Sequence, residues 1–133
     1  MDLARATVER LVEAARRAQR RAYAPYSKFS VGAAVLAEDG QIFVGCNVEN
    51  GSFGLTVCAE RNAVAAAVVA GARPAAVAVV APGSATAPCG ACRQVLAEFS
   101  ADMPVVLAGP DGDDRHLESL DALLPSAFRF GER

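Results

Sequence analysis

Cys58-Ala59-Glu60-Arg61 and, further along the chain, Pro88-Cys89-Gly90-Ala91-Cys92 offer three cysteine thiolates to one metal ion. Zinc accepts sulfur ligands readily, and a catalytic zinc site has three protein ligands with its fourth position open to water. The two motifs therefore predict one Zn²⁺ per chain, bound by Cys58, Cys89 and Cys92.

Glu60 follows the first of these cysteines by two residues. A carboxylate beside an open metal site can take a proton from the metal-activated water and hand it on, so we expect Glu60 to be the catalytic acid–base group. Three thiolates on Zn²⁺ leave an excess negative charge, which makes bound water a weaker acid than at a site of neutral imidazoles. Arg61 is expected to donate to the thiolates and offset that charge.

The spacing of the cysteines also predicts where they stand on helices. Cys89 and Cys92 are three residues apart and share one face of a helix expected over residues 89–99. Cys58 stands near the start of a second helix, expected over residues 56–70 with Thr56 as its cap. Two helix amino termini directed at the sulfurs favour the thiolate form.

Two other chemistries are compatible with parts of this pattern. Cys89-Gly90-Ala91-Cys92 by itself is typical of a thiol redox motif at a helix start, although such a motif needs no third cysteine on a separate helix. Cys46 could join the other three cysteines in a closed structural zinc site, but its distance along the chain from Cys58 exceeds the common paired spacing. We interpret Cys46 as a small buried residue on a strand.

The composition suits one compact domain over residues 1–133. With 53% hydrophobic and 21% charged residues, the chain can bury a core. A net charge of −2 provides no basic surface for a polyanion, so we expect no nucleic-acid partner. The apolar run over residues 63–70 is too short to cross a bilayer, and the first residues do not resemble a signal peptide. These features predict a cytoplasmic protein without a membrane partner, in a compartment where thiols stay reduced.

Apolar periodicity and turn residues predict alternating strands and helices. We expect helices over residues 6–22, 56–70 and 89–99, and strands over residues 30–37, 42–48, 75–81 and 105–108. Asp39-Gly40 is a hairpin signal between the first two strands. Residues 117–128 are interpreted as a brief strand or turn followed by Leu-rich helical packing. This order predicts an α/β fold in which helices cover the faces of a mixed sheet.

Other polar and aromatic residues stay ambiguous on chemistry alone. Phe29 beside a strand can be ordinary core, and Asn47 and Glu49 can be turn formers in a polar loop. Phe128 can pack on its own subunit. His116, the only histidine, lies in an acidic segment and is interpreted as a surface residue rather than a ligand.

Several motifs in one order make the chain resemble the small, homotetrameric cytidine deaminases, and the likeness runs from Tyr23 to Phe128. The matching stretches are Ala24-Pro25-Tyr26-Ser27-Lys28-Phe29, Val31-Gly32-Ala33-Ala34, Cys46-Asn47-Val48-Glu49-Asn50, Cys58-Ala59-Glu60-Arg61, Pro88-Cys89-Gly90-Ala91-Cys92-Arg93-Gln94-Val95 and Leu123-Leu124-Pro125-Ser126-Ala127-Phe128.

The resemblance implies a three-layer α/β/α deaminase fold with a mixed sheet of about five strands. It also implies zinc-dependent hydrolysis of cytidine and 2′-deoxycytidine to uridine and 2′-deoxyuridine with loss of ammonia, a reaction of pyrimidine salvage. By the same likeness Cys58, Cys89 and Cys92 bind zinc, and Arg61 bonds their thiolates. Glu60 then moves a proton between water, the ring nitrogen and the leaving amine.

The resemblance further implies a substrate site shared between the subunits of a homotetramer. Asn47 and Glu49 would hold the ribose 3′-hydroxyl, and the amide of Ala59 would hold the base carbonyl. Phe29 would contact the base, and Phe128 would reach over it from a neighbouring subunit.

The chain departs from the family pattern at two places, and a rival activity exists. Ser30 stands where many relatives have proline, and Phe53 where bacterial relatives often have tyrosine. The nearest alternative is a deaminase of a cytosine-nucleoside antibiotic such as blasticidin S, against which Arg61 and Asn47-Val48-Glu49-Asn50 argue. Deamination within a polynucleotide is disfavoured because a basic groove is lacking. A non-catalytic zinc-binding module is the alternative from a different class.

Overall fold

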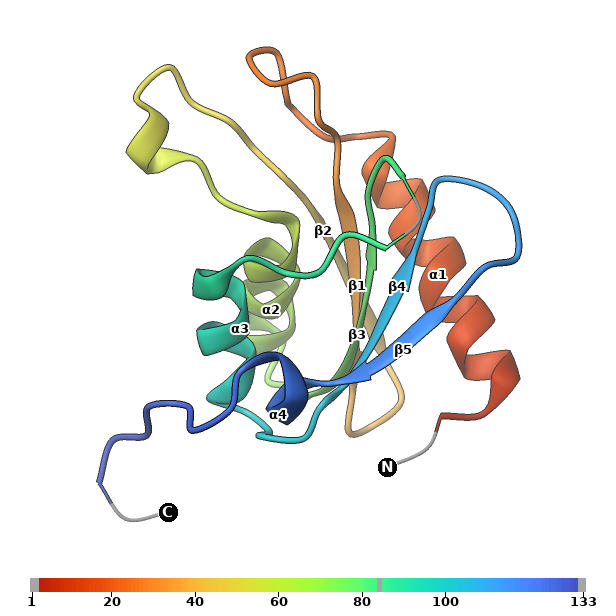
Figure 1. Ribbon diagram of the computed structural model, residues 1–133, viewed down its shortest axis with the longest axis vertical. Coiled ribbons are helices and arrows are strands. Elements are labelled where there is room, and N and C mark those ends of the chain that lie inside the picture. The colour runs from red at the N-terminus through yellow and green to blue at the C-terminus, as the bar shows by residue number, and fades with distance from the viewer. Residues whose placement is uncertain (1–2, 84, 132–133) are drawn as a thin grey trace.

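A computed structural model describes residues 3–83 and 85–131, and within them five strands form one mixed sheet between two layers of helices (Figure 1). The strands are β1 (Gly32–Ala37), β2 (Ile42–Cys46), β3 (Pro74–Val80), β4 (Pro104–Ala108) and β5 (His116–Ser119), in the spatial order β2-β1-β3-β4-β5. Strands β3 and β4 run parallel, and the other neighbours run antiparallel. The predicted α/β/α arrangement with its mixed sheet is confirmed.

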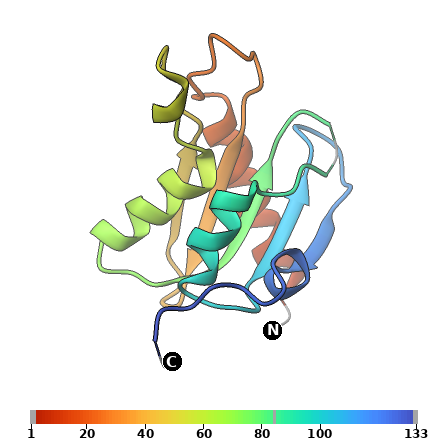
Figure 2. The same cartoon turned by 60° about the vertical axis from the view of Figure 1, so that its left-hand side comes forward.

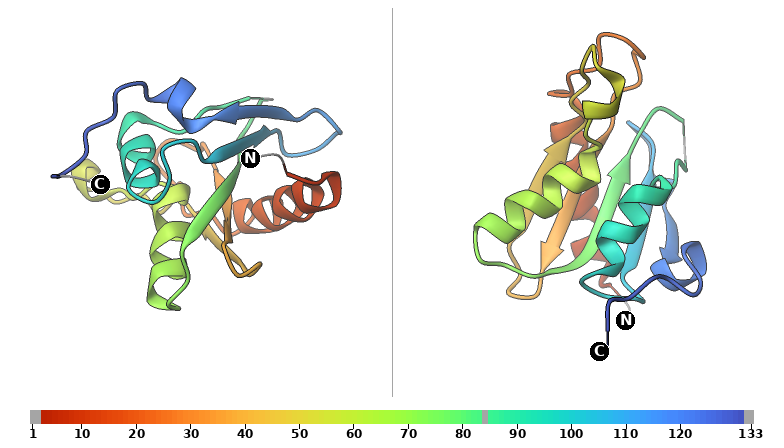
Figure 3. Two further views of the ribbon diagram at one scale, coloured as in Figure 1. Left: turned by 90° about the horizontal axis from the view of Figure 1, so that it is seen from below. Right: turned by 90° about the vertical axis from the view of Figure 1, so that its left-hand side faces the viewer.

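The helices divide between the two faces of the sheet. Helix α1 (Arg5–Gln19) covers one face, and α2 (Ala59–Val69) and α3 (Gly90–Ala97) cover the other, as the left-hand view of Figure 3 shows. A short helix, α4 (Leu120–Leu123), follows β5. None of the helices within the described residues is both long and apolar enough to cross a lipid bilayer.

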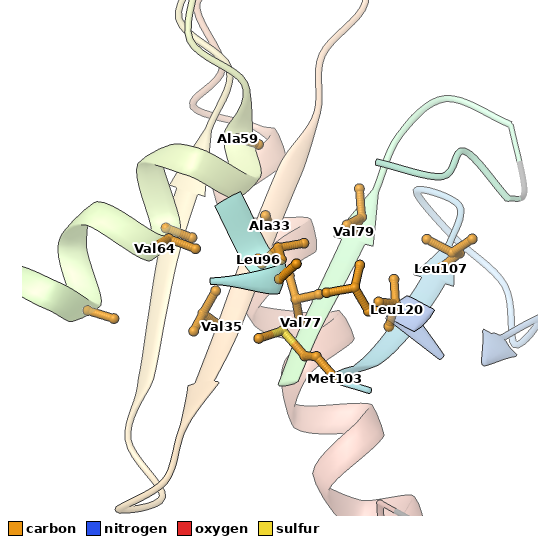
Figure 4. Packing of buried hydrophobic residues seen from close by; sticks show 14 residues of the cluster. Ala33, Val35, Ala59, Val64, Val77, Val79, Leu96, Met103, Leu107 and Leu120 are labelled. Carbon is orange, nitrogen blue, oxygen red and sulfur yellow. The ribbon is translucent and has the colours of Figure 1, made fainter. Parts of the chain in front are cut away.

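The alternation of side chains along each strand builds one core on each face of the sheet, since successive residues point to opposite faces. The core under α1 contains Ala34, Ala78 and Val106. The core under α2 and α3 contains the residues that alternate with these along the strands, such as Val77 and Val79 on either side of Ala78 (Figure 4). Small side chains in β1 and β3 let the helices approach the sheet closely.

Two glycines allow the closest of these helix–sheet contacts. A Cβ atom added at Gly32 in β1 would lie 2.0 Å from the carbonyl oxygen of Ala15 in α1. A Cβ atom added at Gly45 in β2 would lie 2.4 Å from the backbone nitrogen of Ala63 in α2. The backbone of α2 therefore rests directly on β2, and this contact fixes the position of the amino-terminal end of α2.

The helix expected over residues 56–70 begins later than predicted, and Thr56 is not its cap. Val48 and Val57 exchange two backbone hydrogen bonds of 3.0 Å, which hold Val57 in an extended conformation. Cys58 is consequently the residue that precedes the helix. The hydroxyl of Thr56 instead accepts a hydrogen bond from the backbone N–H of Asn50, at 3.1 Å.

The other predicted helices and strands are present, and their ends differ from the expected ones by at most three residues. Helix α1 ends at Gln19 rather than residue 22, because the chain then turns so that Tyr23 forms a bridge with Val48. After β5 and α4 the chain passes beside α3, where Gln94 Nε2 donates to the carbonyl oxygen of Phe128 at 3.1 Å. Helices α2 and α3 both begin at the upper end of the sheet in Figure 2.

Candidate active site

The three cysteines of the sequence motifs meet where α2 and α3 begin. Cys58 immediately precedes α2, Cys89 immediately precedes α3, and Cys92 lies in the first turn of α3. The Sγ atoms of Cys58 and Cys89 are 3.8 Å apart, and those of Cys89 and Cys92 are 3.4 Å apart. All three sulfurs lie within 4.8 Å of one another, so the fold gathers the thiols that the sequence singles out.

The donors and their spacing fit a zinc ion. Zn–S bonds of about 2.3 Å at tetrahedral angles place neighbouring sulfurs about 3.8 Å apart, whereas the sulfurs of a disulfide lie about 2.05 Å apart. The protein has zinc as its cofactor, and this cluster is able to hold it. Cys46 is at the end of β2 as predicted, but it is half-buried rather than buried, and it lies outside the cluster. The four-cysteine site is therefore not supported.

The thiols differ in how readily they lose a proton. Burial and the neighbouring Glu60 carboxylate raise the pKa of Cys92. Burial would also raise the pKa of Cys89, but hydrogen bonds from the N–H groups of Cys92 and Ala91 and from the adjacent thiols outweigh it and lower the pKa. A bound zinc ion would favour the ionised form of all three thiols, because cysteine binds metals as the thiolate.

Glu60 lies beside the sulfurs in the first turn of α2, and only 4% of its surface is exposed. Burial raises the pKa of its carboxyl group above the ordinary value, partly offset by its own backbone N–H, by the Cys92 thiol and by the charge of Arg61. A carboxyl group with a raised pKa can both accept and return a proton near neutral pH.

Arg61 provides a cation at the edge of the cluster. Its Nη2 atom lies 3.5 Å from Cys58 Sγ. Its Nε atom is buried and, in the part of the chain that the structure describes, has no hydrogen-bond partner. The guanidinium therefore has donors available to more than one thiolate.

A pocket of about 420 Å³ opens beside the cysteines. Its walls include Cys58, Cys89, Glu60 and the predicted substrate residues Phe29, Asn47, Glu49 and Ala59. Ala59 is the first residue of α2, so its N–H is one of the four amino-terminal donors that have no acceptor within the helix.

Further residues line the pocket that sequence reasoning did not single out: Ser27, Val31, Thr56, Val79, Thr86 and Ala87. Ser27 and Val31 fall within stretches quoted for the resemblance, which was a usable signal. Val79 enters from β3 and Thr86 from the connection after it, and neither has a local pattern that marks it.

Asn47 and Glu49 both hold the loop that forms one wall of this pocket. Asn47 Nδ2 donates to the carbonyl oxygen of Phe29 at 2.8 Å, and Asn47 Oδ1 accepts the N–H of Val31 at 2.9 Å. Glu49 Oε1 accepts the N–H groups of Tyr26 and Ser27, at 2.9 and 3.1 Å. Glu49 Oε2 accepts the Ser27 hydroxyl.

These contacts of Asn47 and Glu49 with the described residues leave one hydrogen-bond donor and one acceptor available to a ligand. An amide group has two donor hydrogens and a carboxylate has about four lone-pair sites. Among the contacts of the described residues, Asn47 keeps one N–H and Glu49 Oε2 keeps acceptor capacity. A single hydroxyl group can accept from Asn47 and donate to Glu49.

Phe128 and His116 lie apart from this pocket. Phe128 is 71% exposed on the segment after α4 and does not line the pocket of its own chain. His116 is the exposed first residue of β5 and is not part of the cysteine cluster, as predicted for a surface residue. Phe53 is 75% exposed and contacts the Tyr26 ring edge-on, with ring centroids 6.0 Å apart.

Comparison with known proteins agrees with this geometry. A family model described as the cytidine and deoxycytidylate deaminase zinc-binding region matches residues 5–108. The chain is 51% identical over 124 residues to the cytidine deaminase of Sporosarcina psychrophila, covering 91% of this chain and 90% of that protein. It is 48% identical over 121 residues to the cytidine deaminase of Halalkalibacterium halodurans, covering 89% and 91%.

Solved structures give the same result. The crystal structure of cytidine deaminase from Burkholderia pseudomallei matches with a TM-score of 0.84 and 50% identity, covering 90% of this chain and 98% of that one. Cytidine deaminase from Mycobacterium tuberculosis matches with a TM-score of 0.79 and 44% identity, covering 92% and 97%. The antibiotic-deaminase, redox and non-catalytic alternatives gain no support from these relatives. Sequence, fold and relatives agree over nearly the whole chain, and the protein belongs to the cytidine deaminase family.

Proposed function

We propose that this protein hydrolyses the exocyclic amine of cytidine and 2′-deoxycytidine, yielding uridine or 2′-deoxyuridine and ammonia, in cytoplasmic pyrimidine salvage. The observation that carries the proposal is the buried Glu60 carboxyl beside three clustered thiols, on the wall of a pocket large enough for a nucleoside. The names of the relatives support this choice of substrate. Residues 1–133 act as one domain in this proposal.

Cys58, Cys89 and Cys92 would hold one zinc ion, with Arg61 offsetting the excess charge of the thiolates. When bound, zinc supplies a nucleophile at neutral pH by acidifying a water molecule in its open position. The amino-terminal ends of α2 and α3 add positive partial charge beside the sulfurs and favour their ionised form.

Glu60 moves the proton in the proposed reaction. It takes one proton from the attacking water and places it on the ring nitrogen next to the reacting carbon. It then takes the second proton of that water, from the hydroxyl now on the reacting carbon, and passes it to the leaving amine, which departs as ammonia while the carbonyl forms. Burial suits both halves of this task, because the raised pKa makes the protonated carboxyl accessible during turnover. The low exposure of the side chain also limits proton exchange with bulk water.

The remaining residues of the pocket hold the nucleoside. Asn47 and Glu49 provide the donor and acceptor that one sugar hydroxyl needs. We assign this hydroxyl to the 3′ position on the family resemblance, and the 2′ position is excluded because 2′-deoxycytidine lacks it. The free N–H of Ala59 donates to the base carbonyl. Phe29, at 40% exposure on the pocket wall, packs against the base.

Assembly into a homotetramer with shared sites completes the proposal. The outer side of α2 exposes Ala65, Val68 and Val69, with Val69 at 89%. The part of α2 from residue 63 onward is apolar on all sides, which is typical of a buried helix. Phe128 is exposed and absent from the pocket of its own chain, which suits a role in a neighbouring subunit's site.

A direct assay tests this function. Purified protein loaded with zinc is mixed with cytidine, and the reaction is followed at an ultraviolet wavelength where cytidine and uridine differ. We expect uridine formation, its loss after chelation, and its return with added zinc. Glu118→Ala, at an exposed carboxylate on β5, is the control that keeps full activity. Zinc-loaded protein that releases no uridine or deoxyuridine would contradict the proposal.

A further inference from the structure

We propose that Ser27 is a positioning residue for nucleoside binding, whose hydroxyl fixes the Glu49 carboxylate in the orientation that receives the sugar hydroxyl. The inference deepens the proposed function and rests on it. It starts from a hydrogen-bond arrangement in which one short turn reaches both oxygens of the same carboxylate.

The Ser27 hydroxyl has no freedom to point elsewhere. The backbone N–H of Phe29 donates to Ser27 Oγ at 3.0 Å and occupies one of its lone pairs. A serine hydroxyl has a single proton, which Ser27 donates to Glu49 Oε2. The accepted bond from Phe29 therefore orients the donated bond to Glu49.

Glu49 Oε2 is the oxygen that matters for the substrate. Glu49 Oε1 already accepts two backbone N–H groups, from Tyr26 and Ser27. Oε2 accepts only the Ser27 hydroxyl among the contacts within the described residues, so its remaining lone pair is the one left for a ligand. Ser27 and Glu49 both line the pocket.

The turn that presents Ser27 is held in an unusual backbone conformation. Lys28 has φ = 61°, in the left-handed region that non-glycine residues seldom occupy, and its N–H donates to the carbonyl oxygen of Ala24 at 3.0 Å. Such residues persist where surrounding contacts fix them, and they cluster at ligand sites. The Ser27 hydroxyl accepts the N–H of Phe29, the residue after Lys28, and donates to Glu49. These two hydrogen bonds link the turn to the carboxylate.

Exposure explains why the hydroxyl is needed. Ser27 and Phe29 are exposed and Glu49 is half-buried, so without the hydroxyl donor water can take its place at Oε2 and the carboxylate can rotate. Loss of one hydrogen bond to a charged group is worth about a tenfold change in affinity. The effect is confined to substrates that use Glu49.

The experiment compares Ser27→Ala, Ser27→Thr and the unaltered protein, all loaded with zinc. With cytidine, we expect Ser27→Ala to raise KM about tenfold while kcat changes less than threefold, and Ser27→Thr to restore KM because it keeps the hydroxyl. With 3′-deoxycytidine, which has no hydroxyl for Glu49, the inhibition constant against cytidine should differ less than threefold between the three proteins.

Ser100→Ala is a matched control. The Ser100 hydroxyl also donates to an exposed carboxylate, Asp102 Oδ1 at 3.0 Å, but neither residue lines the pocket. We expect its KM for cytidine to be unchanged. Circular dichroism and zinc content verify that each variant is folded and loaded.

The results separate the two proposals. An unaltered protein that does not deaminate cytidine contradicts the proposed function. An active protein in which Ser27→Ala leaves KM for cytidine unchanged, or weakens cytidine and 3′-deoxycytidine equally, overturns the role of Ser27 alone.

Discussion

Arg61 Nη2 lies 3.5 Å from Cys58 Sγ, so a permanently charged guanidinium adjoins the first of three thiols from a position one residue past Glu60. The contact links two needs of the site. The thiolates need a cation to offset their charge, and the guanidinium, buried at Nε, needs acceptors.

Replacing Arg61 should weaken zinc binding before it affects folding. We expect Arg61→Gln to lower zinc affinity by about 10–100-fold, as loss of a partner to a metal ligand usually does. Competition with a chelating indicator measures this change. Arg93→Gln is a useful comparison, because Arg93 bonds the carbonyl oxygens of Pro88 and Leu123 rather than a thiol. An Arg61 variant that holds zinc as tightly as the original would contradict the charge argument.

Removing the Glu60 carboxylate should separate metal binding from turnover. We expect Glu60→Gln and Glu60→Ala to keep one zinc per chain and to lower kcat by about 10²–10⁴-fold, the usual range for loss of an acid–base group. Elemental analysis and the ultraviolet assay supply the two readouts. Full turnover at unchanged zinc content would exclude the assigned proton transfer.

Cysteine substitutions should distinguish the three-thiol cluster from the rest of the chain. We expect Cys46→Ser to keep one zinc per chain, because Cys46 lies outside the cluster. Cys92→Ser removes a predicted ligand, and we expect this variant to lose most of its zinc after dialysis. Zinc loss from the Cys46 variant would instead favour a closed site of four cysteines.

The contact of α2 with β2 should make Gly45 intolerant of a side chain. A Cβ atom there would lie 2.4 Å from Ala63 N and 2.5 Å from Ala59 O, so backbone must move. We expect Gly45→Ala to lower the free energy of unfolding by about 1–3 kcal/mol, the range for overpacking. Gly54→Ala, where a Cβ meets nothing within 4 Å, is the control, with a change of about 0.5 kcal/mol or less. Denaturant titration of both variants measures the difference.

The ionisation of Glu49 should depend on Ser27. The Ser27 hydroxyl lowers the pKa of Glu49. Partial burial of the carboxylate opposes this effect, and the N–H groups of Ser27 and Tyr26 and the charge of Lys28 reinforce it. A lowered pKa keeps the carboxylate charged further into acid, so Ser27→Ala should raise the pKa toward the ordinary value. NMR titration of the ¹³C-labelled carboxyl group tests the sign, and an unchanged or lower pKa would contradict it.

The metal cluster was predictable from the sequence because its chemistry requires particular donors. Cys58, Cys89 and Cys92 each stand in a short motif, and local helix geometry is enough to place Cys89 beside Cys92. A mixed sheet with helices on its faces followed from alternating helix and strand patterns, because the central strands β1, β3 and β4 are apolar on both faces.

Contacts between distant backbone segments were not predictable in the same way. The start of α2 was placed at Thr56 because threonine is a good cap, but pairing of Val57 with Val48 takes that residue out of the helix. The hydrogen bonds by which Asn47 and Glu49 hold the loop before β1 are mainly bonds to backbone groups. Residue type at those loop positions says little about such bonds.

Cys58 and Cys89 stand where a serine or aspartate normally caps a helix. A metal ion bound by both thiols would link the first turns of α2 and α3, which are far apart in sequence but cover the same face of the sheet. Ligands that bind only the native state stabilise it in proportion to their availability. Zinc supply would thus govern the heat tolerance and lifetime of the protein as well as its turnover.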